Sequence, residues 1–473
     1  MKLRSMVLAA IAACAAHAAM AAPEPAIVLA PAADIALARE ILKQLVEIDS
    51  THAHGSTVAA KAIEKRLLAA GFAAADITVL APADHPTKGN VVVRLHGKTR
   101  AKPVIFICHL DVVEAKPEDW TTNPFKLTEK DGYFYGRGTI DIKEGDAVLV
   151  ENLIRLKREG YQPDRDLIFA FTADEEAGGD ANGPAFLLAH HRDLVDAAFA
   201  LNFDDGTGTL VDGRRAYYEL GTAEKIYTTL KLEATSPGGH GSLPGTGNPI
   251  YRIADGLSRW EQYKFPVTLT ATTRDSFAKI AALEPSADSA DMLAVAQTPP
   301  DLEAAERLSR KPAFNAQLRT TCVPTLISGG HAEGALPQRA QATIQCRMLP
   351  SDSIANVTKQ LVSVLNDPEI TVTQDVAPIQ APESPAPPAV KDKVEAVLHS
   401  IWPTVPVVQT MGSGYSDARQ FRGAGIPTYG VGGVWIEHSE NRAHGRDERV
   451  GVAAFDESVE YSYRLIKAFG QAQ

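Results

Sequence analysis

The sequence is poor in cysteine, and this scarcity excludes a small fold held together by disulfides. There are four cysteines among 473 residues. Cys14 lies in an apolar N-terminal stretch, which leaves Cys108, Cys322 and Cys346 for the remainder of the chain. Three cysteines do not make a disulfide framework. Cys108 lies inside an apolar run and is expected to be a small core residue, so at most one bridge can form.

Positive charge and long apolar runs are also lacking. The net charge of −11 argues against a nucleic acid partner, because phosphates attract Lys and Arg. Beyond the N-terminus, no run is long and apolar enough to predict a membrane span. There is no G-x-S-x-G motif, the signature of a serine hydrolase nucleophile elbow. The 45% hydrophobic content is that of an ordinary globular protein, and the length favours two or three domains.

The N-terminus has the pattern of an export signal. A basic start precedes an apolar run that ends in Ala19-Met20-Ala21, an A-x-A cleavage site. We therefore expect residues 1–21 to be a signal peptide, residues 22–33 to be a linker, and the protein to be periplasmic or secreted. An alternative is that the residues up to Cys14 form a lipobox, which would make the protein a lipoprotein anchored at that cysteine.

The order of expected strands and helices indicates two interleaved domains. Over residues 34–223, apolar strands alternate with helices, which is typical of an α/β domain. Residues 224–383 change to strand, helix, two strands, helix and strand, a compact α+β domain, in which a polar stretch at Glu284–Pro312 interrupts the helical part. Residues 384–473 return to the alternation of strands and helices seen over residues 34–223, and form the second part of the same α/β domain. The predicted fold class is α/β, with a mostly parallel central sheet, interrupted by a smaller α+β domain.

Acidic residues and a histidine follow the apolar strands of the α/β part. The four stretches are Cys108-His109-Leu110-Asp111, Gly136–Asp141, Asp174-Glu175-Glu176 and Asp204-Asp205-Gly206. They are about thirty residues apart, the length of one strand–helix–strand unit. In open α/β sheets, ligands bind at the carboxyl ends of the strands. Carboxylates that converge there repel each other unless cations lie between them. Mixed His and carboxylate ligands suit zinc, with cobalt or manganese as alternatives.

In this order, the motifs resemble those of a known family. HLDVV, GRGTID, DEE, DDG, SPGGHGSLP, SDARQFRGAGIP and NRAHGRDERV are similar to motifs of the di-zinc metallopeptidases that include glutamate carboxypeptidases, aminoacylases and succinyl-diaminopimelate desuccinylases. The resemblance covers nearly all of the mature chain. It implies a zinc-exopeptidase-like catalytic domain with a lid that often serves for dimerisation. It also implies hydrolysis of an amide next to a free carboxylate, in a peptide, a dipeptide or an N-acyl amino acid.

The resemblance further implies which residues hold the metals. Five ligands would bind two zinc ions: His109, Asp141, Glu176, Asp204 and His444. Asp141 would bridge the two ions, and Asp205 is an alternative to Asp204.

The same resemblance implies roles for four residues beside the metals. Glu175 is the expected general base, and Asp111 the carboxylate that orients His109. His240, in the lid, would stabilise the oxyanion. Arg347 would grip the carboxylate of a small peptide or N-acyl amino acid substrate.

Three structural expectations and one functional alternative complete the prediction. The family resemblance suggests a cis peptide at Asp141–Ile142. Cys322 and Cys346 lie symmetrically about the loop near Gly334, so a cross-strand disulfide is expected in an oxidising compartment. Dimeric relatives imply a homodimer in which His240 completes the partner's site. The alternative function is a non-catalytic binding protein, which would be expected to lose a ligand or the base. All five expected ligands and the expected base, Glu175, are present in the sequence.

Overall fold

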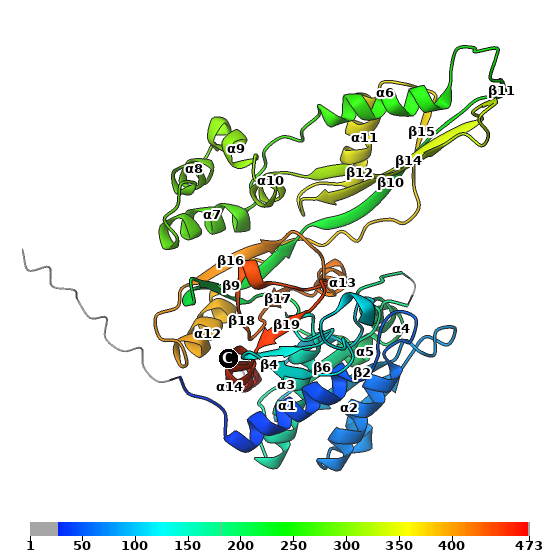
Figure 1. Cartoon of the computed structure of the whole chain (residues 1–473). Coiled ribbons are helices and arrows are strands. Elements are labelled where there is room, and N and C mark those ends of the chain that lie inside the picture. Colours follow the sequence, from blue (N-terminus) through cyan, green and yellow to red (C-terminus); the bar gives the residue numbers. More distant parts are fainter. Residues whose placement is uncertain (1–26, 180, 472–473) are drawn as a thin grey trace, which may run out of the picture.

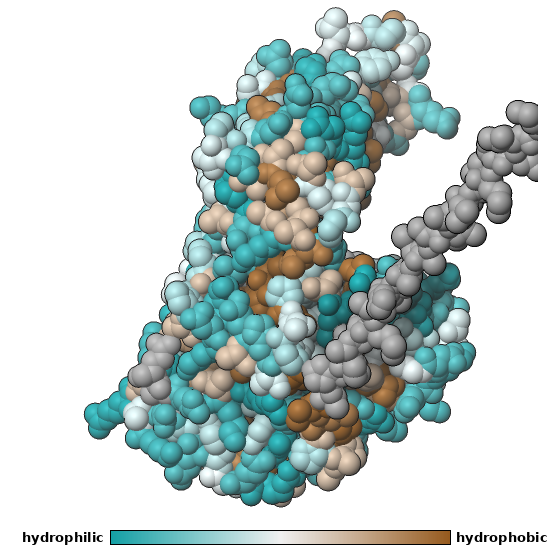
Figure 2. All heavy atoms as spheres, turned by 90° about the vertical axis from the view of Figure 1, so that its left-hand side faces the viewer, coloured by the Kyte–Doolittle hydropathy of each residue, from teal (hydrophilic) through white to brown (hydrophobic). Residues whose placement is uncertain are grey.

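The computed structural model describes residues 27–179 and 181–471, so the expected signal peptide and Cys14 lie outside the described residues. The chain forms a larger α/β unit and a smaller α+β unit (Figure 1). Figure 2 shows the two as separate masses joined at a narrower waist, with hydrophilic residues over most of the visible face. Among the helices of the described ranges, none is both long and apolar enough to cross a bilayer.

A ten-stranded sheet forms the centre of the larger unit, in the order β1-β2-β6-β3-β7-β17-β9-β8-β18, with β16 beside β9. Its central strands pair in parallel: β6 (Leu167–Thr172), β3 (Val104–His109), β7 (Phe199–Asn202) and β17 (Thr428–Gly430). The remaining strands are β1 (Ile77–Leu80), β2 (Asn90–Leu95), β8 (Gly208–Val211), β9 (Arg214–Glu224), β16 (Val407–Gly412) and β18 (Trp435–Glu437).

Helices cover both faces of this sheet, which explains why β3 is an unbroken apolar run. Phe106 belongs to the apolar cluster on one face and Ile107 to the cluster on the other. The first face is covered by α1 (Ala32–Val46), α2 (Thr57–Ala69), α3 (Lys143–Arg158), α12 (Pro388–His399) and α14 (Val452–Gly470). The second is covered by α4 (Gly183–His190), α5 (Arg192–Val195) and α13 (Ala418–Gly423).

A small three-stranded sheet ties the C-terminal segment to the loop before Asp141. It pairs β4 (Thr128–Lys130), β5 (Tyr133–Tyr135) and β19 (Arg449–Gly451). Because β19 follows His444 closely, this pairing brings His444 near Asp141. Three short 3₁₀ helices, η1 (Ala74–Asp76), η2 (Pro117–Asp119) and η3 (His438–Glu440), lie in connecting segments.

The smaller unit has a sheet and an apolar core of its own. The sheet order is β12 (Thr321–Gly329), β14 (Arg339–Met348), β10 (Ile226–Thr235) and β15 (Ile370–Gln374). Buried positions alternate along β10, as expected for a strand covered on one face, and the helices α6 (Pro249–Glu261) and α11 (Ile354–Leu365) pack on it. A hairpin of β11 (Gly239–His240) and β13 (Ala335–Leu336) extends from its end.

Two helices lie within the stretch where the sequence predicted a polar interruption, α8 (Ser289–Val295) and α9 (Leu302–Leu308), and one helix flanks it on either side, α7 (Ala271–Leu283) and α10 (Pro312–Leu318). They share an apolar cluster that includes Phe277 and Leu308, and α7 packs against β16 of the large sheet. The stretch Glu284–Pro312 therefore has helical structure that its polarity concealed.

Two local predictions are confirmed. Cys322 and Cys346 are direct partners across β12 and β14, and their sulfur atoms are bonded at 2.00 Å. The Asp141–Ile142 peptide is cis. Cys108 is a buried free thiol, as its apolar surroundings indicated.

Candidate metal and catalytic site

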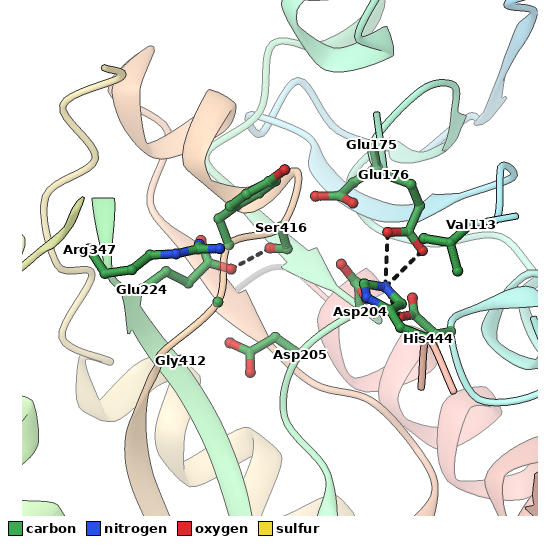
Figure 3. A pocket seen from close by; sticks show the side chains of 13 residues that line it. Val113, Glu175, Glu176, Asp204, Asp205, Glu224, Arg347, Gly412, Ser416 and His444 are labelled. Atoms are coloured by element: carbon green, nitrogen blue, oxygen red, sulfur yellow. Dashed lines mark hydrogen bonds and ion pairs between the residues drawn. The ribbon is translucent and has the colours of Figure 1, made fainter. Parts of the chain in front are cut away.

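A cavity of about 470 Å³ opens at the carboxyl ends of the central strands. Acidic residues from four chain segments line it, together with His444 and, from the smaller unit, Arg347. Figure 3 shows Arg347 on one side of the cavity and Glu176 with His444 on the other. The cavity therefore lies where the two units meet.

Strand topology explains why these residues converge. His109 is the last residue of β3, Glu176 lies just beyond β6, and Asp204 lies just beyond β7. The three strands are parallel neighbours in the sheet, so their carboxyl ends share one edge. Asp141 comes from the loop before α3, and His444 from the loop before β19.

The five predicted ligands form two groups that share Asp141. His109 Nε2 lies 3.1 Å from Asp141 Oδ1 and 3.7 Å from Asp204 Oδ1. His444 Nε2 lies 3.0 Å from Asp141 Oδ2 and 2.9 Å from Glu176 Oε2. Within each group the candidate ligand atoms lie within 4.8 Å of one another. Asp141 thus directs one oxygen to each group, as a carboxylate that bridges two cations would.

The electrostatics of the cluster also fit bound cations. Burial raises the pKa of Asp204 to about 8 and raises the pKa of Glu175 well above its usual range. Hydrogen bonds with Asp141 and Glu176 raise the pKa of His444 to about 10. Burial thus disfavours the charged form of Asp204 and Glu175, and the carboxylates beside His444 favour a positive charge at that position. Divalent cations would supply that charge, and the nitrogen and oxygen donors suit zinc or a similar metal.

Asp111 contacts the turn that carries Glu175. Its Oδ1 accepts a hydrogen bond from the Glu175 N–H, and its Oδ2 accepts one from the Glu176 N–H, both at 3.1 Å. Nδ1 of His109 is 3.0 Å from the main-chain oxygen of Asp111 and 3.8 Å from its carboxylate. The sequence predicted that the carboxylate would orient His109. In the structure that carboxylate accepts its hydrogen bonds from the main-chain amides of Glu175 and Glu176.

The structure brings Asp204, not Asp205, beside His109. Asp205 Oδ1 accepts a hydrogen bond from the Gly206 N–H at 2.8 Å. Its Oδ2 lies 1.8 Å from where a Cβ on Gly221 would be, so only glycine leaves room for this carboxylate. Asp205 lines the cavity but lies outside both groups of candidate ligands.

Two residues were predicted to contact substrate, Arg347 and His240. Arg347 lines the cavity, and His240 does not. The Arg347 guanidinium lies 4.9 Å from the Tyr227 ring and 5.1 Å from the Tyr415 ring. Its Nη1 is buried and has no hydrogen-bond partner in the described part of the chain. His240 is exposed in β11, at the far tip of the smaller unit (Figure 1), and does not line the cavity. Within one chain, His240 is therefore not brought to the metal ligands.

Sequence reasoning missed several residues near the site. Tyr415 lines the cavity beside Arg347, and Lys88 lies with His52 against Asp174, the residue before Glu175. No sequence pattern relates residues 52, 88 and 174, because their proximity depends on how β2 lies beside β6.

An α/β sheet that gathers buried carboxylates and histidines at its strand ends has the architecture of a metal-dependent enzyme. The chain belongs to peptidase family M20/M25/M40, whose sequence model matches residues 105–468. The family membership expected from the motifs is confirmed, and the protein is an enzyme of a metallopeptidase family.

Relatives of similar sequence include a probable carboxypeptidase and an N-fatty-acyl-amino acid synthase/hydrolase. The chain is 27% identical over 393 residues to the probable carboxypeptidase S-like 2 of Dictyostelium discoideum, covering 77% of this chain and 71% of the relative. It is 28% identical over 375 residues to the N-fatty-acyl-amino acid synthase/hydrolase PM20D1 of Xenopus tropicalis, covering 77% and 72%.

Solved structures share the fold at lower identity. The M20 family metallo-carboxypeptidase Sso-CP2 from Sulfolobus solfataricus has a TM-score of 0.67 and 16% identity, covering 92% of this chain and 99% of that one. Human carnosine dipeptidase 1 has a TM-score of 0.60 and 16% identity, covering 93% and 97%.

Proposed function

We propose that the protein is an exported di-zinc hydrolase that cleaves an amide bond next to a free carboxylate, in a peptide, a dipeptide or an N-acyl amino acid. The observation that carries this proposal is the cavity itself. Two groups of candidate metal ligands share Asp141 at one side, and Arg347, whose buried Nη1 has no hydrogen-bond partner among the described residues, faces them from the other. A substrate held by its carboxylate at Arg347 would present its amide to the metals.

The proposal gives seven residues in or beside the cavity a task. His109, Asp141, Glu176, Asp204 and His444 would hold the two metals. Zinc, when bound, supplies a water of lowered pKa and polarises the scissile carbonyl. Glu175 accepts the proton of the attacking water and returns it to the leaving amine. Arg347 fixes the substrate carboxylate through a planar, two-pronged guanidinium. Cobalt or manganese are alternative metals for the same donors.

Export and dimerisation are part of the proposal. The A-x-A site at Ala19-Met20-Ala21 supports cleavage of residues 1–21 and delivery to the periplasm or beyond. The smaller unit would act as the lid and as the dimerisation domain. The exposed position of His240 within one chain supports a role for it in the partner's cavity, where it would stabilise the oxyanion.

A substrate panel tests the proposed reaction. Dipeptides and N-acyl amino acids are incubated with the mature protein, first with zinc and then after treatment with a chelator. Hydrolysis that is lost on chelation and restored by zinc is the expected result. A His109→Ala variant should bind less metal and lose activity. Full metal content and full activity in that variant would contradict the ligand assignment.

Mixing two inactive variants tests the role of His240. His240→Ala and Glu175→Gln proteins are combined under subunit exchange. If His240 acts across the dimer, mixed dimers contain one intact site and activity partly returns. Exchange without recovery, or a fully active monomer, would exclude that arrangement.

A further inference from the structure

The side chain of Glu175 has little to hold it in place. Its residue is only 5% exposed, and its Oε1 is buried without a hydrogen-bond partner in the described part of the chain. Within residues 27–179 and 181–471, no hydrogen bond or ion pair is found on the carboxyl group that would serve as the base. Its position is therefore set by the main chain on either side. One side is held by Asp111, which accepts hydrogen bonds from the Glu175 and Glu176 amides.

Asp174, the residue before Glu175, is held from the other side. Its φ of +59° lies in the left-handed region, which non-glycine residues rarely occupy. Its Oδ1 accepts a hydrogen bond from Lys88 Nζ at 2.5 Å and lies 2.9 Å from His52 Nδ1. Lys88 Nζ also donates to the main-chain oxygen of His52 at 2.7 Å. Three segments of the chain thus meet at one carboxylate oxygen.

This contact is buried and charged. The Asp174 side chain is 1% exposed and the Lys88 side chain 7%. A buried carboxylate needs a paired charge, and Lys88 provides one within a region that already contains Asp111, Glu175 and Glu176. Lys88 therefore holds Asp174 in place and balances its charge, so that Asp174 does not add an unpaired negative charge beside the base.

We propose that Lys88 and Asp174 are positioning residues for the general base: their ion pair, supported by His52, holds the left-handed turn that aims the Glu175 carboxyl into the cavity. This inference rests on the proposed function, because it requires Glu175 to be the base. Neither residue of the pair lines the cavity, so the pair acts only through the main chain of Glu175.

The test measures kcat, KM and metal content for variants of the mature, metal-loaded protein. In Lys88→Met, kcat should fall by about 10- to 100-fold, as expected for a base displaced by a fraction of an ångström or more. KM and metal content should stay close to those of the wild type. Lys88→Arg should recover part of kcat, because it restores a donor and a charge. Asp174→Gly should lose kcat as well, although glycine tolerates the same φ.

Two controls separate positioning from general damage. Lys393→Met removes a lysine that donates to the main-chain oxygen of Ala468, far from the cavity, and should leave kcat unchanged. The double variant Lys88→Met with Asp174→Asn removes both charges, so no unpaired buried charge remains to unfold it. Its kcat should still be low.

Several results would overturn the proposal. They are wild-type kcat in Lys88→Met or in the double variant, a loss of metal that parallels the loss of kcat, and an equal loss in Lys393→Met. Glu175→Gln serves as the reference. If that variant keeps wild-type turnover, Glu175 is not the general base, and that part of the proposed function is wrong.

Discussion

Removal of the Cys322–Cys346 bridge should destabilise the smaller unit by about 3 kcal/mol. The bridge closes a loop with a sequence separation of 24 residues. In the chain-entropy treatment, a loop of this length loses about 12 cal/mol/K in the unfolded state, which corresponds to about 3.4 kcal/mol at 25 °C. Alanine is the better replacement, because Cys346 lies fully buried in an apolar cluster where a serine hydroxyl would lack a partner.

Urea unfolding of the mature protein measures this effect. The variant with alanine at both positions should unfold at a midpoint roughly 1–3 M lower than the wild type, given m-values of about 1–3 kcal/mol/M. Reductant should shift the wild type in the same direction and leave the variant unchanged. Cys108→Ala is the control, because Cys108 is a free thiol and its removal should not change sensitivity to reductant. Thiol titration of the unfolded, unreduced chain should find one free thiol. Three free thiols, or equal midpoints with and without the bridge, would refute the reasoning.

Three further predictions concern the cavity and the core. Glu175→Gln should lower kcat by roughly two to four powers of ten while metal stays bound; near-normal turnover, read from initial rates, would contradict it. Arg347→Met should raise KM by about 10- to 100-fold, the usual loss for a charged hydrogen bond, and Arg347→Lys should recover part of this; equal KM in all three proteins would exclude a carboxylate contact. Glu151 is fully buried in α3, neither of its carboxylate oxygens has a hydrogen-bond partner among the residues that the structure describes, and burial raises its pKa to about 8. Because the pKa of Glu151 is higher in the folded than in the unfolded protein, its protonation favours folding at low pH. This contribution to stability is lost as the pH rises from the pKa in the unfolded protein to the pKa of about 8 in the folded protein. Glu151→Gln should therefore be more stable than the wild type by about 1–3 kcal/mol at pH 8.5 but not at pH 5; a difference in Tm that does not change with pH would refute it.

The sequence by itself determined the class of fold and the candidate ligands. Unbroken apolar runs such as β3 specify strands buried on both faces, and polar residues directly after them must lie at one sheet edge. His109, Asp141, Glu176 and His444 were identified in this way or by the motifs around them. The disulfide was also predictable, because Cys322 and Cys346 flank one loop, and a hairpin pairs residues symmetrically about its turn.

Only the tertiary structure decided contacts between segments that no local pattern relates. The Asp205 carboxylate lies outside both groups of candidate ligands, in space that is left open because Gly221 of β9 has no side chain. Asp111 holds the amides of Glu175 and Glu176, because β3 and β6 lie side by side and end together. Local sequence fixes which residues end a strand. Which side chain fills the space above that end depends on the neighbouring strands, and these are brought together only when the whole chain has folded.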